Sequence, residues 1–255
     1  MRKIYCTIQN FRLINVSTLF VLIALLSSCG NKKEKSSPLF TLVEKSGIDF
    51  RNDVKDNKDD NSFYFRNFYN GGGVALGDIN NDGLPDVLLT SNMGENKLYL
   101  NKGKFRFEDI SNKSGLHQDS MWSTGATMVD INGDGWLDMY ICSSGHMKDG
   151  RRKNKLYINN HNNTFTEEGS KYGLDISGYC TQASFFDYDM DGDLDCFIIN
   201  NSPIPFSSLN YADMRDVDIS KWQVNDNLKG GGNHLFRNDD GHFTEVTKEA
   251  GLHPG

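Results

Sequence analysis

Three nine-residue segments carry oxygen-bearing side chains at one spacing: residues 78–86, 130–138 and 187–195, here the first, second and third acidic loops. Positions 1, 3, 5 and 9 of each loop are Asp or Asn, and position 6 is Gly. A hard cation such as Ca²⁺ takes about six to eight oxygen ligands, which a curved loop of this kind can supply. The chemistry that these residues predict is calcium binding.

Each loop contributes the side chains at positions 1, 3, 5 and 9 and the backbone carbonyl at position 7 as expected ligands. We expect the Gly at position 6 to turn the chain where a Cβ would clash. Up to three Ca²⁺ ions are therefore expected. The side-chain ligands are Asp78, Asn80, Asp82 and Asp86; Asp130, Asn132, Asp134 and Asp138; and Asp187, Asp189, Asp191 and Asp195. The carbonyl ligands are those of Leu84, Trp136 and Asp193.

The EF-hand begins with a similar loop but requires Glu at position 12 and a helix on each side. Position 12 here is Leu89, Ile141 and Ile198, and short apolar runs follow each loop, which indicates strands. A solvated hairpin turn would also be acidic and contain Gly. Three copies with oxygens at the same four positions favour metal loops between strands.

Each acidic loop lies within a longer repeat. An apolar run precedes each loop and another follows it, and then comes an Asn-x-Leu-aromatic-x-Asn element at 96–101, 154–159 and 233–238. A Phe-led segment and a Gly-Leu turn close each unit. The pattern predicts four-stranded antiparallel sheets of the size of one propeller blade, hence an all-β fold. Residues 40–48 match the last strand and turn of a unit and predict an orphan strand.

These motifs resemble the FG-GAP or VCBS repeat, known from the β-propeller of integrin α subunits. Residues 69–86 also resemble the N-terminal part of bacterial surface lipoproteins that carry this repeat and often an ASPIC/UnbV segment, which this sequence lacks. The resemblance implies that the loop residues named above are calcium ligands. Three units are fewer than the about four to eight blades of known propellers, so we expect an incomplete, truncated ring.

The first 29 residues are typical of a lipoprotein signal peptide, with Arg2 and Lys3 before an apolar stretch that ends near Ser-Ser-Cys. The lipobox-like end predicts cleavage before Cys29 and lipidation of Cys29. A polar tether follows at 29–38, and the repeat region covers 39–255. Its units are expected at about 63–116, 117–174 and 175–252, with an insertion at about 201–232.

Charge and cysteine content narrow the functional classes. The formal net charge is −7, which argues against nucleic acid as a partner. Beyond Cys6 and Cys29, three cysteines remain, in or beside predicted strands, and their spacing does not establish a disulfide. Burial as small hydrophobic side chains is the simplest interpretation. These cysteines are Cys142, Cys180 and Cys196.

Enzymatic motifs such as His-Glu-x-x-His, Gly-x-Ser-x-Gly and Cys-x-x-Cys are absent from the sequence. The insertion offers aromatic and charged side chains on a long connection, where binding functions are often found. The alternative is a loop packed against the neighbouring blade. The candidate ligand-binding residues are Phe206, Tyr211, Arg215 and Trp222.

The favoured hypothesis is a non-enzymatic, calcium-stabilised binding or adhesion module, lipid-anchored in the bacterial cell envelope at the outer membrane and cell surface. Its ligand would be a protein or a glycan. The alternatives are a carbohydrate-active or other hydrolytic propeller, and an accessory subunit of an outer-membrane uptake complex.

Overall fold

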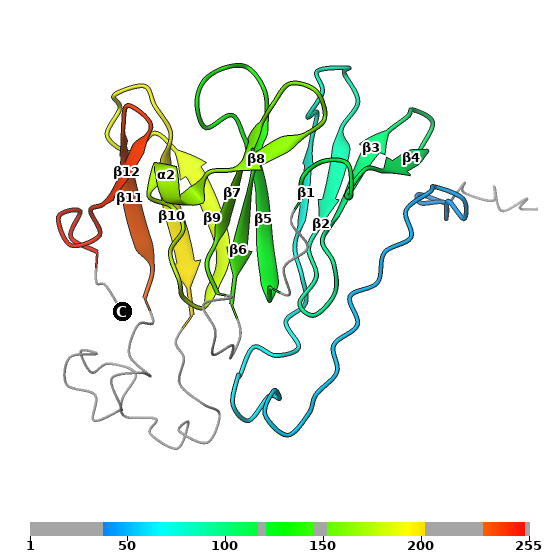
Figure 1. Cartoon of the computed structure of the whole chain (residues 1–255), viewed down its shortest axis with the longest axis horizontal. Helices are drawn as coiled ribbons and strands as arrows, with labels where there is room; N and C mark the ends of the chain where they lie inside the picture. The colour runs from blue at the N-terminus through cyan, green and yellow to red at the C-terminus, as the bar shows by residue number, and fades with distance from the viewer. Residues whose placement is uncertain (1–37, 117–120, 145–151, 202–231, 253–255) are drawn as a thin grey trace, which may run out of the picture. The chain divides into compact units, whose positions relative to one another are not determined.

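A computed structural model describes residues 38–116, 121–144, 152–201 and 232–252. The part of the chain that begins at Val43 is one compact unit, and the contacts below lie within it. Three four-stranded antiparallel sheets make up this unit (Figure 1). The predicted all-β fold of blade-like sheets is confirmed.

Each sheet is formed by four consecutive strands in chain order. The first sheet contains β1 (Val74–Gly77), β2 (Asp86–Leu89), β3 (Lys97–Asn101) and β4 (Phe107–Asp109). The second contains β5 (Ser123–Val129), β6 (Asp138–Ser143), β7 (Lys155–Asn159) and β8 (Phe165–Glu167). The third contains β9 (Cys180–Phe186), β10 (Asp195–Asn200), β11 (His234–Asp239) and β12 (His242–Glu245). One helical turn, α2 (Gly169–Tyr172), follows β8.

The second sheet is covered on both faces because it lies between the other two. All six residues of β6 are buried. On β7, Leu156 belongs to the core shared with the third sheet, while its neighbour Tyr157 belongs to the core shared with the first. Successive side chains of a strand point to opposite faces, so a sheet buried on both sides has no polar face.

Two apolar cores hold the three sheets together, and each draws side chains from both of the sheets that it joins. Burial of this surface is the main favourable contribution to stacking. The first core consists of Ala75, Ile79, Leu88, Leu98, Leu100, Ile110, Leu116, Ala126, Met139, Ile141, Tyr157 and Phe165. The second consists of Ile131, Tyr140, Cys142, Leu156, Tyr172, Leu174, Cys180, Ala183, Cys196, Ile198, Phe236 and Phe243.

The Gly-Leu turn after each of the first two sheets also contacts the next sheet. The backbone N–H of Phe165 donates to the carbonyl of Ser114 at 2.7 Å. Gly115 has φ 81°, and a Cβ at this position would lie 2.6 Å from the carbonyl oxygen of Phe165. Gly173, with φ 80°, approaches the carbonyl of Phe243 in the same way, at 2.7 Å. Glycine is required here by both the dihedral angle and the available space.

The N-terminal segment at 40–48 forms no strand, so the predicted orphan strand is wrong for these residues. The turn in this segment, however, packs on the first sheet in the way that each Gly-Leu turn packs on the next sheet. Phe107 donates its backbone N–H to the carbonyl of Ser46 at 2.7 Å, and Gly47 has φ 88°. A strand requires a hydrogen-bonded neighbour, whereas a turn needs only the sheet on which it packs.

The first Asn of the Asn-x-Leu-aromatic-x-Asn element fixes the end of each sheet opposite the acidic loops. The side-chain oxygen of Asn96 accepts the backbone N–H of Ser91 at 2.9 Å, and that of Asn154 accepts the N–H of Ser143 at 2.8 Å. Asn233 makes the corresponding bond at 3.2 Å. The N–H at or just beyond the end of the second strand is thereby satisfied in every sheet.

Candidate metal sites

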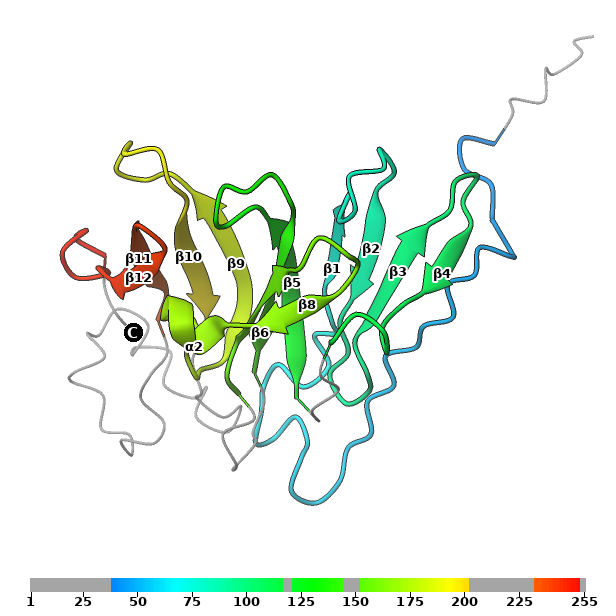
Figure 2. The same ribbon diagram turned by 45° about the horizontal axis from the view of Figure 1, so that its top comes forward.

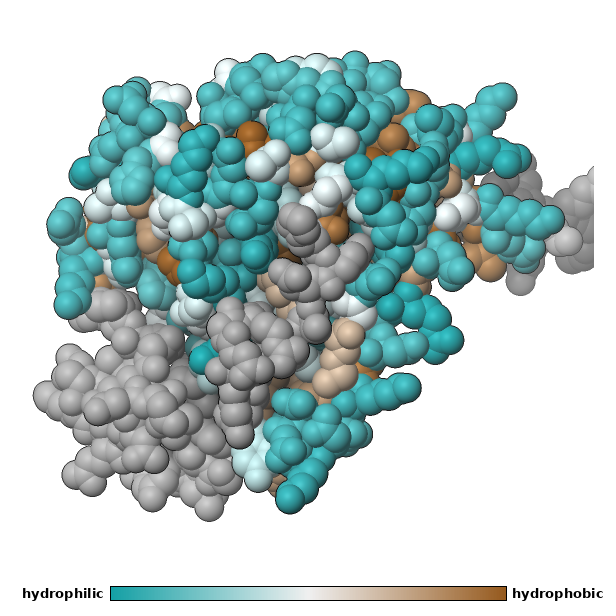
Figure 3. All heavy atoms as spheres, viewed as in Figure 1, coloured by the Kyte–Doolittle hydropathy of each residue, from teal (hydrophilic) through white to brown (hydrophobic). Residues whose placement is uncertain are grey.

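The three acidic loops join the first two strands of each sheet and lie at the same end of the sheets (Figure 2). Hydrophilic residues cover this end (Figure 3). Gly83 and Gly135 have φ of 85° and 86°, and Gly192 has φ 105°. A Cβ at these positions would meet nothing within 4 Å beyond the adjacent residues. The left-handed dihedral angle alone requires glycine.

The first Asp of each loop closes the loop on itself. Asp78 accepts the backbone N–H groups of Asp82 at 3.1 Å and Gly83 at 2.7 Å. Asp130 makes the same two bonds at 3.1 and 2.8 Å. Asp187 accepts the N–H groups of positions 4 and 6 at 2.6 and 3.1 Å. The curvature expected from the sequence is therefore built into the loops by their own hydrogen bonds.

The ninth residue of each loop is a fully buried Asp at the start of the second strand. One carboxylate oxygen accepts the N–H of position 2, at 3.0, 3.1 and 2.8 Å in the first, second and third loops. The other accepts a backbone N–H from the end of the third strand, at 2.7, 2.8 and 2.9 Å. The three donors of this second bond are Asn101, Asn159 and Asn238.

These Asn residues were missed as members of the site by sequence reasoning. The signal was present, because the Asn-x-Leu-aromatic-x-Asn element ends on Asn in all three units. Their side chains also support the acidic loops: the amide of Asn101 donates to the carbonyl of Pro85 at 2.8 Å, and that of Asn238 donates to the carbonyl of Leu194 at 3.2 Å.

Burial of the ninth Asp leaves its charge poorly compensated. Desolvation raises the pKa of Asp138 to about 6, although the N–H groups of Asn159 and Ile131 act against this shift. Desolvation raises the pKa of Asp86 as well. The donors to both carboxylates are neutral backbone groups, and burial of a charge without a charged partner is costly. A bound cation would remove this cost.

Positions 3 and 5 pair with each other in the first two loops. The amide of Asn80 donates to Asp82 at 3.1 Å, and the amide of Asn132 donates to Asp134 at 3.0 Å. His161 adds a contact from its Nε2 to Asp134 at 3.1 Å and stacks on the ring of Trp136, with centroids 4.7 Å apart. The position 5 carboxylates of these two loops thus have hydrogen-bond partners.

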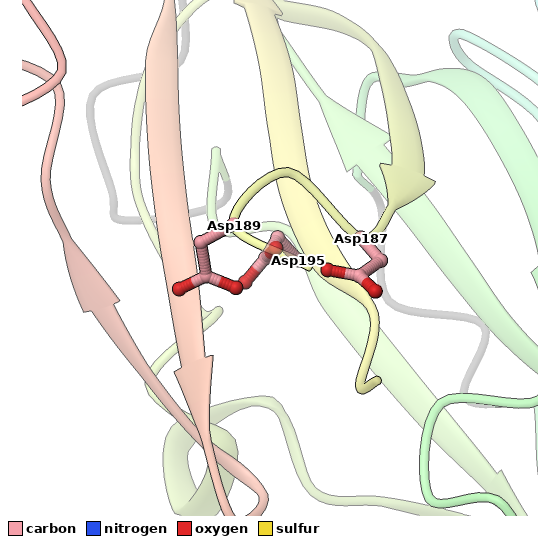
Figure 4. A group of neighbouring side chains, drawn as sticks. All are labelled: Asp187, Asp189 and Asp195. Carbon is pink, nitrogen blue, oxygen red and sulfur yellow. The ribbon is translucent and has the colours of Figure 1, made fainter. Parts of the chain in front are cut away.

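The third loop differs because its position 3 is Asp, which has no amide to donate. Asp187, Asp189 and Asp195 each offer a carboxylate oxygen, and the three oxygens lie within 4.8 Å of one another (Figure 4). Within the described ranges, this is the one group of three or more His, Cys, Asp or Glu side chains close enough to share an ion. Asp195 is buried, whereas the other two are exposed.

Repulsion within the third loop is evident in its pKa shifts. The pKa of Asp189 is raised by desolvation and by the negative charges of Asp191 and Asp195. Desolvation and the charge of Asp191 raise the pKa of Asp193 to about 6. One carboxylate oxygen of Asp193 is buried with no hydrogen-bond partner. An oxygen-only donor set with excess negative charge fits a hard divalent cation such as Ca²⁺.

Position 7 lies next to the position 5 carboxylate in every loop. The N–H of Leu84 donates to Asp82 at 2.9 Å, and that of Trp136 donates to Asp134 at 2.9 Å. The N–H of Asp193 donates to the third-loop carboxylate at position 5 at 3.1 Å. The ligand roles assigned from the sequence to positions 1, 3, 5, 7 and 9 all stay predictions.

Other residues singled out in the sequence fall into two groups. The three cysteines of the sheets are free and buried, and burial raises the pKa of the Cys180 thiol to about 11. No helix among the described residues has the length and apolar content to cross a membrane. The lipidation candidate and the ligand-binding candidates lie outside the described residues: Cys29, Phe206, Tyr211, Arg215 and Trp222.

Comparison with known proteins identifies a repeat family that matches the segments containing the acidic loops. Two adjacent segments, residues 78–141 and 142–198, match the FG-GAP-like repeat. A stretch of 74 residues is 35% identical to Cartilage acidic protein 1 of Xenopus tropicalis; it covers 29% of this chain and 11% of that protein. The match thus spans about a tenth of the length of that relative. The chain therefore contains two adjacent segments that match the FG-GAP-like repeat, the repeat that its sequence motifs resemble.

Proposed function

We propose that this chain is a calcium-stabilised binding module in which each acidic loop holds one Ca²⁺ ion. The observation that carries the proposal is the convergence of Asp187, Asp189 and Asp195, whose carboxylate oxygens lie within 4.8 Å of one another. The second observation is the burial of the ninth Asp in all three loops, where each carboxylate accepts two neutral backbone N–H groups. The side chains at positions 1, 3, 5 and 9 and the carbonyl at position 7 would hold each ion.

The role of the ion in this proposal is structural. Antiparallel pairing of β1 with β2 extends to Gly77 and Asp86, immediately beside the first loop. Pairing of β5 with β6 and of β9 with β10 ends at the equivalent positions. An ion would fix the end of each strand pair. A calcium sensor requires a helix pair that opens on binding, and these loops join strands of one sheet instead.

Thermal unfolding of the full chain tests this proposal. A ligand at about 100 times its Kd stabilises a protein by about 2.7 kcal/mol per site. For a chain of this size, that free energy corresponds to a rise in Tm of roughly 5–10 °C. We expect EDTA to lower the Tm and Ca²⁺ to restore it. A Tm that responds to neither would refute the metal assignment.

A conservative substitution gives the experiment a matched control. Asp189→Asn creates at position 3 the amide that the first two loops already carry, so we expect a folded protein that binds one Ca²⁺ ion more weakly. Asp59→Asn removes an exposed acid outside the loops and should leave the calcium response unchanged. Equal calcium responses from both variants would contradict the role of Asp189.

The binding part of the proposal follows from the family. FG-GAP-like repeats are typically non-catalytic and build propeller-type binding or adhesion modules. We propose a protein or glycan ligand, no nucleic acid, and no enzymatic activity. The proposed binding segment is the insertion at 201–232. Glycan-array binding by the full chain, compared with a variant that lacks this insertion, tests the segment; equal binding by both would contradict it.

We also propose that the chain is anchored by lipid on Cys29 and resides in a bacterial cell envelope, at the outer membrane. This proposal is based on the signal-like N-terminus and the lipobox-like residues before Cys29. Cys29→Ser should shift the protein from the detergent phase to the aqueous phase in a partition experiment. Unchanged partitioning would refute lipidation.

A further inference from the structure

We propose that the first and second acidic loops are coupled, so that an ion in one raises the affinity of the other, while the third loop binds independently of the first. The inference rests on the calcium binding proposed above. It comes from two side chains that connect the first two loops directly, Asn81 and Asn159.

Asn159, at the end of β7, contacts both loops at once. Its amide donates to the carbonyl of Ile79 in the first loop at 2.8 Å and to the carbonyl of Leu137 in the second loop at 3.0 Å. Its backbone N–H donates to Asp138, the ninth residue of the second loop, at 2.8 Å. The side chain is buried, so these bonds are protected from competition with water. A shift in either loop therefore changes the donor that supports the other.

Asn81 provides a second link on the solvent side. It occupies position 4 of the first loop, and its amide donates to the carbonyl of Gly135 in the second loop at 3.1 Å. Gly135 precedes Trp136, whose carbonyl is an expected ligand. Position 4 has positive φ in all three loops, but the other two residues there, Gly133 and Met190, have no amide. The residue type at position 4 thus allows this link from the first loop alone.

The third loop is supported within its own sheet. Asn238 is the counterpart of Asn159, and its amide donates to the carbonyl of Leu194 at 3.2 Å, in the loop of the same sheet. Its backbone N–H also remains within that sheet, bonded to Asp195. Among the described residues, no side-chain hydrogen bond of this kind connects the third loop to the first.

The sign of the coupling follows from conformational ordering. An ion in the first loop would hold Asn80 and Asp82, the neighbours of Asn81, and so fix the donor that contacts Gly135. The second loop then loses less conformational freedom when its own ion binds, which gives positive cooperativity. A net hydrogen-bond contribution of the usual size corresponds to a change in affinity of about two- to tenfold.

Luminescence of bound Tb³⁺ reports on the second loop, because Trp136 belongs to that loop and can sensitise an adjacent lanthanide. Four full-length proteins are compared: wild type, Asp82→Ala to disable the first loop, Asn81→Gly to remove the link, and the double variant. Gly is chosen because the second loop carries it at the same position with positive φ. Trp136→Phe identifies the signal that belongs to the second loop.

We expect Asp82→Ala to weaken Tb³⁺ binding at the second loop by about two- to tenfold in the wild-type background. The same substitution should have a smaller effect in the Asn81→Gly background. Met190→Gly, the same change at position 4 of the third loop, should leave the affinity of the second loop unaltered. Asn81→Gly alone should weaken the second loop, which tests the link without disabling a site.

Two outcomes separate the inference from the proposed function. Calcium displacement of Tb³⁺ with equal second-loop affinity in wild type and Asp82→Ala would overturn the coupling and leave calcium binding intact. Failure of wild type to bind either ion would overturn both. Circular dichroism of each variant checks that the sheets are retained. If Asp82→Ala unfolds, Asn81→Gly alone tests the coupling, and equal second-loop affinity in Asn81→Gly and wild type would overturn it.

Discussion

The contact between sheets at the Gly-Leu turn leads to a quantitative prediction. Gly115→Ala places a Cβ 2.6 Å from the carbonyl oxygen of Phe165, in a residue with φ 81°. Gly71 has φ 84°, and a Cβ there would meet nothing within 4 Å. Gly71→Ala is therefore a matched control for the dihedral angle alone. The difference between the two variants isolates the contact between the first and second sheets.

The left-handed dihedral angle costs a non-glycine residue about 1–2 kcal/mol, and this cost applies to both variants. At Gly115 the clash adds about 1–3 kcal/mol, and loss of the bond between Phe165 and Ser114 adds about 0.5–1.5 kcal/mol. We expect Gly115→Ala to lower the free energy of unfolding by about 2.5–6.5 kcal/mol. For Gly71→Ala we expect about 1–2 kcal/mol.

Urea unfolding followed by circular dichroism measures both variants, with a constant concentration of EDTA to keep ion binding out of the comparison. The reduced entropy of the unfolded chain on Gly→Ala substitution is the same at both positions and cancels. Equal loss of stability in the two variants would show that the turn does not hold the sheets together, and the reasoning from the close contact would be refuted.

Three further predictions concern the buried groups. Tyr140→Phe should lower the free energy of unfolding by about 1–3 kcal/mol, because the hydroxyl bonds the amide of Asn154 at 2.9 Å in the core. Combined with Asn154→Ala, its effect should be non-additive in a double-mutant cycle; additivity would contradict the bond. Trp122→Ala should expose segment 61–70 to limited proteolysis, since Phe65 and Phe68 pack on Trp122, and an unchanged cleavage pattern would contradict this packing. Iodoacetamide labelling, read by mass spectrometry, should be slow in the native state and fast in denaturant at Cys142, Cys180 and Cys196; fast native labelling would contradict their burial.

The features that the sequence predicts correctly are local ones. The Gly at position 6 adopts a left-handed conformation in all three loops, as the short-range pattern requires. The apolar runs on either side of the loops form paired strands with the ninth Asp at the start of the second strand. Both results depend on residues within about ten positions of one another, where residue type restricts the backbone directly.

Contacts between distant units could not be predicted in this way. Asn159 bonds to a carbonyl of Ile79, which is 80 residues earlier, and neither residue type indicates such a partner. The predicted strand at 40–48 fails for a related reason, because intrinsic preference does not supply a neighbouring strand.

The two Asn residues of the Asn-x-Leu-aromatic-x-Asn element explain how a small acidic loop keeps its shape. The first Asn holds the far end of the second strand, and the last Asn donates to the ninth Asp. The frame of each loop is therefore fixed by the third strand as well as by its own residues. In the first two loops an amide at position 3 also compensates the position 5 carboxylate. The third loop has Asp189 at that position and greater charge repulsion, so we expect its order to depend most on a bound cation.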